Sequence, residues 1–242
     1  MMGGAMFPGD APLMPIPFRL PRFYPILDTA ALAVRHCPAN AAAEPLLEAG
    51  VKILQYRHKD EWTQDHFNQA EEIAKLCHER GVLFVLNDRA DFARLLGAAL
   101  HVGQDDLPPA AARRVVSDEV IGFSTHNDFQ LTRANEEPVE YISIGPIFRT
   151  NSKNNPDPAV GIEGLSHLRR LTQKPLVAIG GITLENAKAV LDAGANSVAV
   201  ISALLPDTCN RRAMQRSAEE WIRACRLDTL RDDFLLEPLS GK

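Results

Sequence analysis

The feature that most constrains the fold is an eight-fold alternation of a short β-branched or aromatic run with a longer stretch of helical pattern. Short apolar runs of this kind predict buried strands, and their alternation with amphipathic helices predicts parallel βαβ units. Eight such units predict an α/β fold, a single-domain (β/α)8 TIM barrel. The predicted strands are Phe23–Leu27, Lys52–Arg57, Leu83–Asn87, Ala99–Val102, Val120–Phe123, Tyr141–Ile144, Leu176–Ile179 and Ser197–Ile201.

The stretches between these strands carry helix start and stop signals. Apolar residues recur at helical spacing in Asp65–Arg80, and Thr183 is a suitable N-cap for a helix over Leu184–Ala193. Four glycines follow predicted helix ends, where left-handed backbone is common: Gly50, Gly81, Gly97 and Gly194. The helices after Val102 and Ile144 have the weakest patterns, which leaves an open doubly wound sheet as the alternative. No GxGxxG fingerprint follows the first strand, and this favours the barrel.

The length of 242 residues suits one barrel, because such barrels typically have about 250 residues. We predict a flexible N-terminal extension over residues 1–20, a catalytic barrel over 21–226 and a C-terminal tail over 227–242. The first residues lack a basic n-region, and no apolar run approaches the roughly 18 residues of a membrane-spanning helix. The sequence therefore predicts a cytoplasmic protein with no membrane segment.

Charge and cysteine content narrow the range of partners. The formal net charge of -5 gives no general attraction to nucleic acids. Four separated cysteines without a CxxC pair predict neither a zinc ribbon nor a disulfide framework, which fits a reducing cytoplasm: Cys37, Cys77, Cys209 and Cys225. The expected partners are small molecules, and the sequence leaves open whether the chain forms a homo-oligomer.

The active site of such a barrel lies at the carboxyl ends of the strands. In the second predicted strand, one face changes from apolar Ile53 to polar Gln55 and Arg57, with Lys59 two residues further on. These side chains are candidates for binding an anion. A solvated strand end is the alternative interpretation, and the strand alone does not decide between them.

Carboxylates follow the next two strands. Asp88 comes after the third strand and Asp106 after the fourth, so neighbouring strands bring them together. Two carboxylates suit Mg²⁺, which often takes only one or two protein oxygens and completes its shell with water and substrate phosphate. The alternatives are that Asp88 pairs with Arg89 and that Asp105 or Asp106 caps the following helix.

Polar residues also follow the fifth and sixth strands. Ser124 and His126 could hold an anion, whereas Asn127 is a candidate helix cap. The long segment from Ile147 to Pro158 precedes the next helix and carries hydroxyls, amides and Lys153. Loops of this length are uncommon in compact domains unless they are disordered or functional, and the polar residues favour a lid that contacts phosphate.

The turns after the last two strands predict a phosphate site. Gly180 and Gly181 follow the seventh strand, and Ile201 and Ser202 stand where the chain leaves the eighth. Barrels commonly bind phosphate with these two loops, through backbone amides and a helix N-terminus. A tight turn that needs glycine for its dihedral angles is the alternative, and it explains one glycine better than two.

In this order, the strand-end motifs resemble the thiamine-phosphate synthase family over roughly Phe23 to Leu204. The motifs are Gln55-Tyr56-Arg57-His58-Lys59, Asn87-Asp88, His101-Val102-Gly103-Gln104-Asp105-Asp106, Gly122-Phe123-Ser124, Gly145-Pro146-Ile147-Phe148, Gly180-Gly181-Ile182 and Ile201-Ser202. The resemblance implies a transferase that joins 4-amino-5-hydroxymethyl-2-methylpyrimidine pyrophosphate to a thiazole phosphate, with Mg²⁺ required. It also implies loss of pyrophosphate before attack by the thiazole nitrogen.

The resemblance further implies a role for each matching residue. The pyrimidine pyrophosphate would contact Gln55, Arg57, Lys59, Asn87, Ser124 and Lys153, and the metal would be held by Asp88 and Asp106. The thiazole phosphate would contact Thr150, Ser152, Gly180, Gly181, Ile201 and Ser202. Arg57, Lys59 and Lys153 would act on the departing charge. Ser152 departs from the family's usual threonine, and Arg149 stands where proline is frequent.

Two other functions are weighed against this one. A thiazole tautomerase of the same barrel family would be expected to carry a histidine near Pro146 and no acid at Asp106. A non-catalytic module that binds thiazole or thiamine phosphate would need neither the metal acids nor Lys153. The full set of residues disfavours both.

Overall fold

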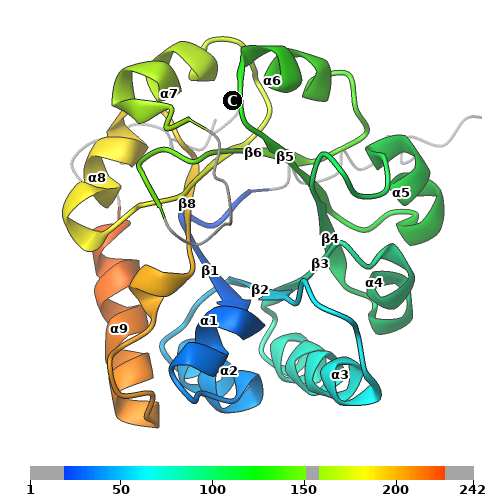
Figure 1. The fold of residues 1–242 in the computed structure, drawn as a ribbon, viewed down its shortest axis with the longest axis vertical. Helices are drawn as coiled ribbons and strands as arrows, with labels where there is room; N and C mark the ends of the chain where they lie inside the picture. Colours follow the sequence, from blue (N-terminus) through cyan, green and yellow to red (C-terminus); the bar gives the residue numbers. More distant parts are fainter. Residues whose placement is uncertain (1–18, 151–157, 227–242) are drawn as a thin grey trace, which may run out of the picture.

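The computed structural model describes residues 19–150 and 158–226, in which eight parallel strands form a closed barrel surrounded by helices (Figure 1). Each strand pairs with the next along the chain, and the eighth pairs with the first. The strands are β1 (Phe23–Asp28), β2 (Ile53–Arg57), β3 (Leu83–Asn87), β4 (Ala99–Val102), β5 (Ile121–Thr125), β6 (Tyr141–Ile144), β7 (Leu176–Ile179) and β8 (Ser197–Val200). The predicted (β/α)8 barrel is therefore confirmed, and the open sheet is excluded.

The helices form the outer ring. They are α1 (Thr29–Val34), α2 (Ala39–Glu48), α3 (Gln64–Glu79), α4 (Ala90–Leu96), α5 (Pro109–Val116), α6 (Asp128–Ala134), α7 (Gly161–Arg169), α8 (Leu184–Asp192) and α9 (Arg211–Ala224), with a short 3₁₀ turn η1 (Ser202–Leu204). The two helices with weak sequence patterns, α5 and α7, are both present. Thr183 caps α8 in a capping box, as predicted.

Side chains alternate between two cores along each strand. One set fills the barrel interior and comprises Tyr24, Ile26, Ile53, Val85, Ala99, Tyr141, Val177 and Ala199. The other packs under the helices and includes Leu27, Leu54, Leu86, Leu100 and Ile142. Gly122 faces the interior beside Tyr141, because an added Cβ atom would lie 2.0 Å from the Cζ atom of that ring. The large Tyr141 ring thus requires glycine on the neighbouring strand.

Barrel closure brings the first and last parts of the described chain together. Trp221 of α9 is fully buried and stacks on Phe23 of β1, with ring centroids 5.7 Å apart. Cys37, before α2, forms a disulfide with Cys209, before α9, across a sequence separation of 172 residues. The prediction that the cysteines form no disulfide is therefore wrong for this pair. The two residues meet because α2 and α9 pack side by side once β1 and β8 have paired.

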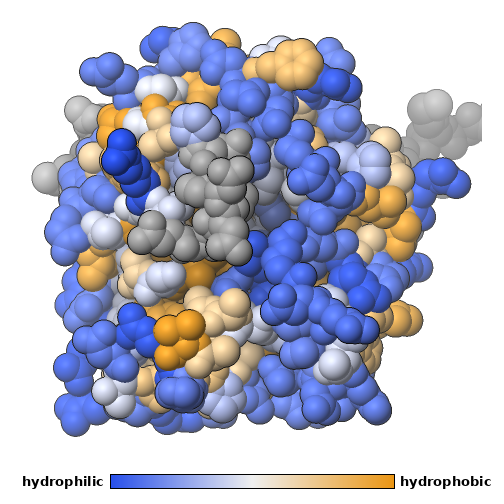
Figure 2. Space-filling view, in the orientation of Figure 1, coloured by the Kyte–Doolittle hydropathy of each residue, from blue (hydrophilic) through white to orange (hydrophobic). Residues whose placement is uncertain are grey.

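The large apolar side chains that are exposed lie on separate elements of the described structure. Figure 2 shows a mainly hydrophilic face with small hydrophobic areas. The most exposed large apolar side chains, Val34, Leu95 and Phe129, lie on three different helices, α1, α4 and α6. Among the residues that the structure describes, no helix is long and apolar enough to span a membrane.

Candidate active site

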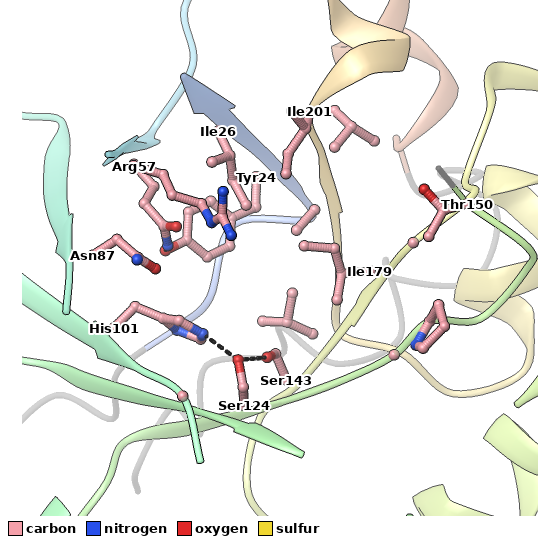
Figure 3. A pocket seen from close by; sticks show the side chains of 18 of the residues that line it. Tyr24, Ile26, Arg57, Asn87, His101, Ser124, Ser143, Thr150, Ile179 and Ile201 are labelled. Atoms are coloured by element: carbon pink, nitrogen blue, oxygen red, sulfur yellow. Dashed lines mark hydrogen bonds between the residues drawn. The ribbon is translucent and has the colours of Figure 1, made fainter. Parts of the chain in front are cut away.

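A cavity of about 730 Å³ opens at the carboxyl ends of the strands. Every described residue that the sequence predicts for the site lines this cavity, and Figure 3 shows some of their side chains pointing into it. These residues are Gln55, Arg57, Lys59, Asn87, Asp88, Asp106, Ser124, Thr150, Gly180, Gly181, Ile201 and Ser202. Ser152 and Lys153 lie outside the described residues. The structure thus brings twelve separately predicted residues around one space, and their individual roles stay predictions.

Strand β2 contributes two side chains that are each held by a partner from β1. Gln55 is buried and donates a hydrogen bond from Nε2 to the hydroxyl of Tyr24 at 2.8 Å. Arg57 donates from Nη1 to Oδ2 of Asp28, the residue opposite it in the β1–β2 register. The sequence interpretation of a merely solvated strand end does not hold, because both side chains have defined partners inside the barrel mouth.

Lys59 lies between the two predicted metal ligands. Its Nζ atom is 2.6 Å from Oδ2 of Asp88 and 3.8 Å from Oδ2 of Asp106. Asp88 follows β3 in the left-handed backbone region, with φ of 66°, and its amide donates to the carbonyl of His101 on β4 at 2.8 Å. This tight turn directs the Asp88 carboxylate toward the end of β4. Asp88 and Asp106 therefore share a single cation.

The alternative interpretations of these two acids are wrong. Arg89 pairs with Asp91 of α4 rather than with Asp88. Helix α5 begins after Pro108 without a side-chain cap, and Asp106 instead accepts a hydrogen bond from the amide of Gly103 at 2.7 Å. Neither carboxylate is used to start the helix that follows it.

Because the two acids lie close together, the pKa of Asp88 is raised and that of Asp106 is lowered. Burial, reinforced by the hydrogen bond to Asp106, raises the pKa of Asp88 to about 6 against the opposing effect of Lys59. Burial also acts to raise the pKa of Asp106, but the hydrogen bonds from Asp88 and from the Gly103 amide, together with Lys59, outweigh it and lower that pKa. The pair thus favours holding one proton or one cation between its oxygens.

A hydrogen-bonded network of polar side chains forms the floor of the cavity. His101 contacts the Tyr141 hydroxyl through Nδ1 at 3.0 Å and Ser124 Oγ through Nε2 at 2.9 Å. The Tyr141 hydroxyl lies 2.9 Å from that of Tyr24, and Ser124 Oγ lies 3.3 Å from Ser143 Oγ (Figure 3). Burial raises the pKa of both tyrosines, so their hydroxyls keep their protons.

The sequence interpretation missed Tyr24 and Ser143, which line the cavity, and Tyr141, which contacts Tyr24 and His101 without lining it. Their strand positions were the available signal, because Tyr24 alternates with Ile26 on an inward-facing side and Tyr141 with Ser143. Nothing in the sequence alone distinguishes these polar residues from ordinary filling of a barrel core.

Asn87 offers a hydrogen-bond donor to the cavity. The side chain is 4% exposed and lines the cavity, and its Nδ2 atom has no hydrogen-bond partner. Buried amide groups are normally satisfied, so an unpaired one deserves an explanation. A ligand with acceptor oxygens would supply the missing partner.

The seventh and eighth strand ends form the opposite side of the cavity. Gly180 and Gly181 have φ of 97° and 65°, in the left-handed region. A Cβ atom on Gly180 would lie 2.6 Å from Pro146 Cβ, and one on Gly181 would lie 2.7 Å from the Arg149 carbonyl oxygen. The turn therefore requires both glycines, although the sequence led us to expect that a turn would explain one better than two. It also brings the backbone to the cavity surface.

Of the two residues after β5, one caps a helix and the other lines the cavity. Asn127 caps α6, because its Oδ1 atom accepts a hydrogen bond from the amide of Gln130 at 3.0 Å, as predicted. His126 lines the cavity and contacts the Gly145 carbonyl oxygen through Nδ1 at 2.6 Å. This contact links the end of β5 to the start of the loop after β6.

The chain resembles characterised proteins along most of its length. Residues 23–204 match the family described as thiamine monophosphate synthase. The thiamine-phosphate synthase of Koribacter versatilis is 48% identical over 80% of this chain and 93% of that protein, and that of Chloroflexus aurantiacus is 38% identical over 69% and 77%. The solved thiamine phosphate pyrophosphorylase of Pyrococcus furiosus is 27% identical, with a TM-score of 0.73 over 85% of this chain and 95% of that one. This chain belongs to the thiamine monophosphate synthase family.

Proposed function

We propose that this protein is a thiamine-phosphate synthase. The transferase joins 4-amino-5-hydroxymethyl-2-methylpyrimidine pyrophosphate to 4-methyl-5-(2-phosphoethyl)thiazole or its carboxylated form. The bond between the pyrimidine methylene carbon and the pyrophosphate oxygen breaks, and the thiazole nitrogen forms the new bond to that carbon. The products are thiamine phosphate and pyrophosphate, and carbon dioxide leaves as well when the thiazole is carboxylated. In a chain of this family, the observation that carries the proposal is the grouping of Arg57, Lys59, Asp88 and Asp106 on one side of the cavity.

The proposed pyrophosphate side is supported by charge and by the unpaired donor. Arg57 and Lys59 supply positive charge, and the free Nδ2 atom of Asn87 supplies a neutral donor. Donors fixed before the reaction stabilise charge that develops on a leaving group, because they need little reorganisation. Lys153 is proposed to add a third cation from the loop after β6.

The two acids fit a Mg²⁺ ion. Their oxygens already lie around one ammonium group, and carboxylates are the ligands that Mg²⁺ prefers. Among the described residues, no group of three or more His, Cys, Asp or Glu side chains could hold a metal. Two carboxylates suffice when substrate phosphate and water complete the shell. Bound there, the ion would neutralise charge on the pyrophosphate as it leaves.

The other residues are proposed to align the thiazole substrate and exclude water. The segments at Gly180–Gly181 and Ile201–Ser202 bring backbone close to the cavity surface, where they would hold the thiazole phosphate. Thr150 and Ser152 would contact the same phosphate from the loop after β6. Loss of pyrophosphate leaves an electron-poor methylene carbon that water would capture, so a closed cavity favours the thiazole nitrogen as the nucleophile.

The two competing functions are not favoured. The relatives described above are thiamine-phosphate synthases, and no tautomerase or regulatory module is among them. A tautomerase or a regulatory module would have no use for a pair of acids around Lys59, and the described structure contains that pair at the cavity wall.

The test is to incubate the purified protein with both substrates and Mg²⁺ and to detect thiamine phosphate by its fluorescence after oxidation. We expect product with Mg²⁺ and none after chelation. The Asp106→Asn variant should lower kcat by about 100-fold or more, because several kcal/mol of charge stabilisation depends on the ion. Asp91→Asn is the matched control, since Asp91 pairs with Arg89 outside the cavity. Full activity in Asp106→Asn would refute the metal assignment, and no product from the wild type would refute the function.

A further inference from the structure

Asp28 lies behind the cavity rather than in its wall. It is the last residue of β1 and stands opposite Arg57 in the β1–β2 register. Arg57 lines the cavity and points into it in Figure 3, whereas Asp28 is not among the lining residues. A substrate in the cavity would therefore meet Arg57 directly and Asp28 only through Arg57.

Both oxygens of the Asp28 carboxylate have fixed partners. Oδ1 accepts a hydrogen bond from the Ala31 amide at 2.9 Å and so caps α1, while Oδ2 accepts one from Arg57 Nη1. The residue is 7% exposed. A buried carboxylate held at one oxygen by a helix N-terminus cannot rotate freely, so its second oxygen is a fixed point for the guanidinium.

A fixed point matters for arginine because its side chain is long and has about 2 kcal/mol of rotamer entropy. Among the described residues, Asp28 is the only acid that ion-pairs with Arg57. The pair engages Nη1, and the guanidinium has five N–H donors in a planar fork, so donors remain for a ligand. Holding one edge of the fork fixes the direction of the others.

We propose that Asp28 is a positioning residue that orients the Arg57 guanidinium toward an anionic phosphate group of the substrate. This inference depends on the proposed function only in taking Arg57 as a pyrophosphate ligand. Asp28 lowers the positive charge at the site, and its benefit is an arginine that is already oriented when the anion arrives.

The test uses substitutions that keep the helix cap but remove the arginine partner. In Asp28→Asn, Oδ1 can still accept from the Ala31 amide, whereas the amide nitrogen that replaces Oδ2 cannot accept from Arg57. Asp28→Ser keeps a capping hydroxyl that is too short to reach Arg57. Asp91→Asn serves as the matched control, because it removes an acid paired with Arg89 near the start of α4.

The decisive measurement is the binding of inorganic pyrophosphate with Mg²⁺, by calorimetry, in a double-mutant cycle with Arg57→Ala. We expect Asp28→Asn to weaken binding about tenfold with Arg57 present, which is the size of one lost charge-assisted hydrogen bond. With Arg57→Ala, the same substitution should change binding less than twofold. Asp91→Asn should have no effect.

Several results would overturn the proposal. An equal loss in both backgrounds would mean that Asp28 acts through the fold, and no loss, or no binding by the wild type, would mean that it does not orient a pyrophosphate ligand. If circular dichroism shows that Asp28→Asn does not fold, Asp28→Ser replaces it in the cycle. A thiamine phosphate assay on the wild type separates the two hypotheses. If no product forms but Asp28→Asn still weakens pyrophosphate binding only when Arg57 is present, the function alone is refuted. If product forms but Asp28→Asn has the same effect with and without Arg57, the positioning role alone is refuted.

Discussion

Replacing Asp88 with asparagine is expected to stabilise the metal-free protein at pH 8. The pKa of the Asp88 carboxyl rises from 3.8 to about 6 on folding, because burial and Asp106 disfavour its charge. Such a shift corresponds to at most about 3 kcal/mol of folding free energy. Water reaches the side chain, which is 18% exposed, so we expect about 1–2 kcal/mol after allowing for solvent screening. In a domain of this size that raises Tm by roughly 2–8 °C.

The sign follows from which state binds the proton more tightly. Because the folded state of Asp88 has the higher pKa, ionisation costs stability, and the whole cost is present above the folded pKa of about 6. Below the unfolded value of 3.8, both states are protonated and the cost disappears. The advantage of Asp88→Asn should therefore be greatest at pH 8 and fall to about half at pH 5.

Thermal unfolding in a chelator, followed by circular dichroism at pH 8 and pH 5, measures this difference. Asp91→Asn is the control, and it should lower Tm instead of raising it. The hydrogen bond from Arg89 lowers the pKa of Asp91, so ionised Asp91 stabilises the fold above its unfolded pKa, and this stabilisation is lost as pH falls. Added Mg²⁺ should reverse the ranking at pH 8 by stabilising only the wild type. Equal Tm values for Asp88→Asn and wild type, or a difference independent of pH, would refute the reasoning.

Two further predictions concern the fold. Replacing Cys37 and Cys209 with serine should lower the free energy of unfolding by up to about 5 kcal/mol, the chain-entropy value for a loop of 172 residues. Denaturant titration measures this loss, and a reductant should destabilise the wild type but not the double variant. Gly122→Ala should cost about 1–3 kcal/mol by overpacking and lower activity, because the new methyl group displaces Tyr141; wild-type stability and kinetics would contradict the described packing.

Much of the fold could be predicted because local pattern and barrel geometry agree. The predicted limits of β3, β4, β6 and β7 match the observed ones, since each strand is buried on both faces and is bounded by turn residues. The disulfide could not be predicted, because no pattern near Cys37 or Cys209 indicates that α2 packs on α9. That contact belongs to the closed barrel, in which β8 pairs with β1.

Some residues of the candidate site could likewise be predicted from the sequence, and others could not. Asp88 and Asp106 were accessible to sequence reasoning, because each follows a strand and neighbouring strands place them together. Asp28 also ends a strand, but the sequence cannot show that one of its oxygens caps α1 while the other meets Arg57. Tyr24 and Tyr141 contact each other across the barrel interior, and a contact between strands that are not neighbours is fixed by closure rather than by local pattern.

Arg57, at the end of β2, and Lys59, two residues after it, are each paired with an acid before any ligand is present. Arg57 is held by Asp28, and Lys59 lies between Asp88 and Asp106. The acids lower the attraction for an anion, but they keep two long side chains ordered, which reduces the entropy lost on binding. The two pairs are expected to respond differently to Mg²⁺. A divalent ion at Asp88 and Asp106 would release Lys59 toward the pyrophosphate. Arg57 would stay paired with Asp28. Lys59 would therefore become available to the substrate when the metal binds, whereas Arg57 would hold the same position throughout.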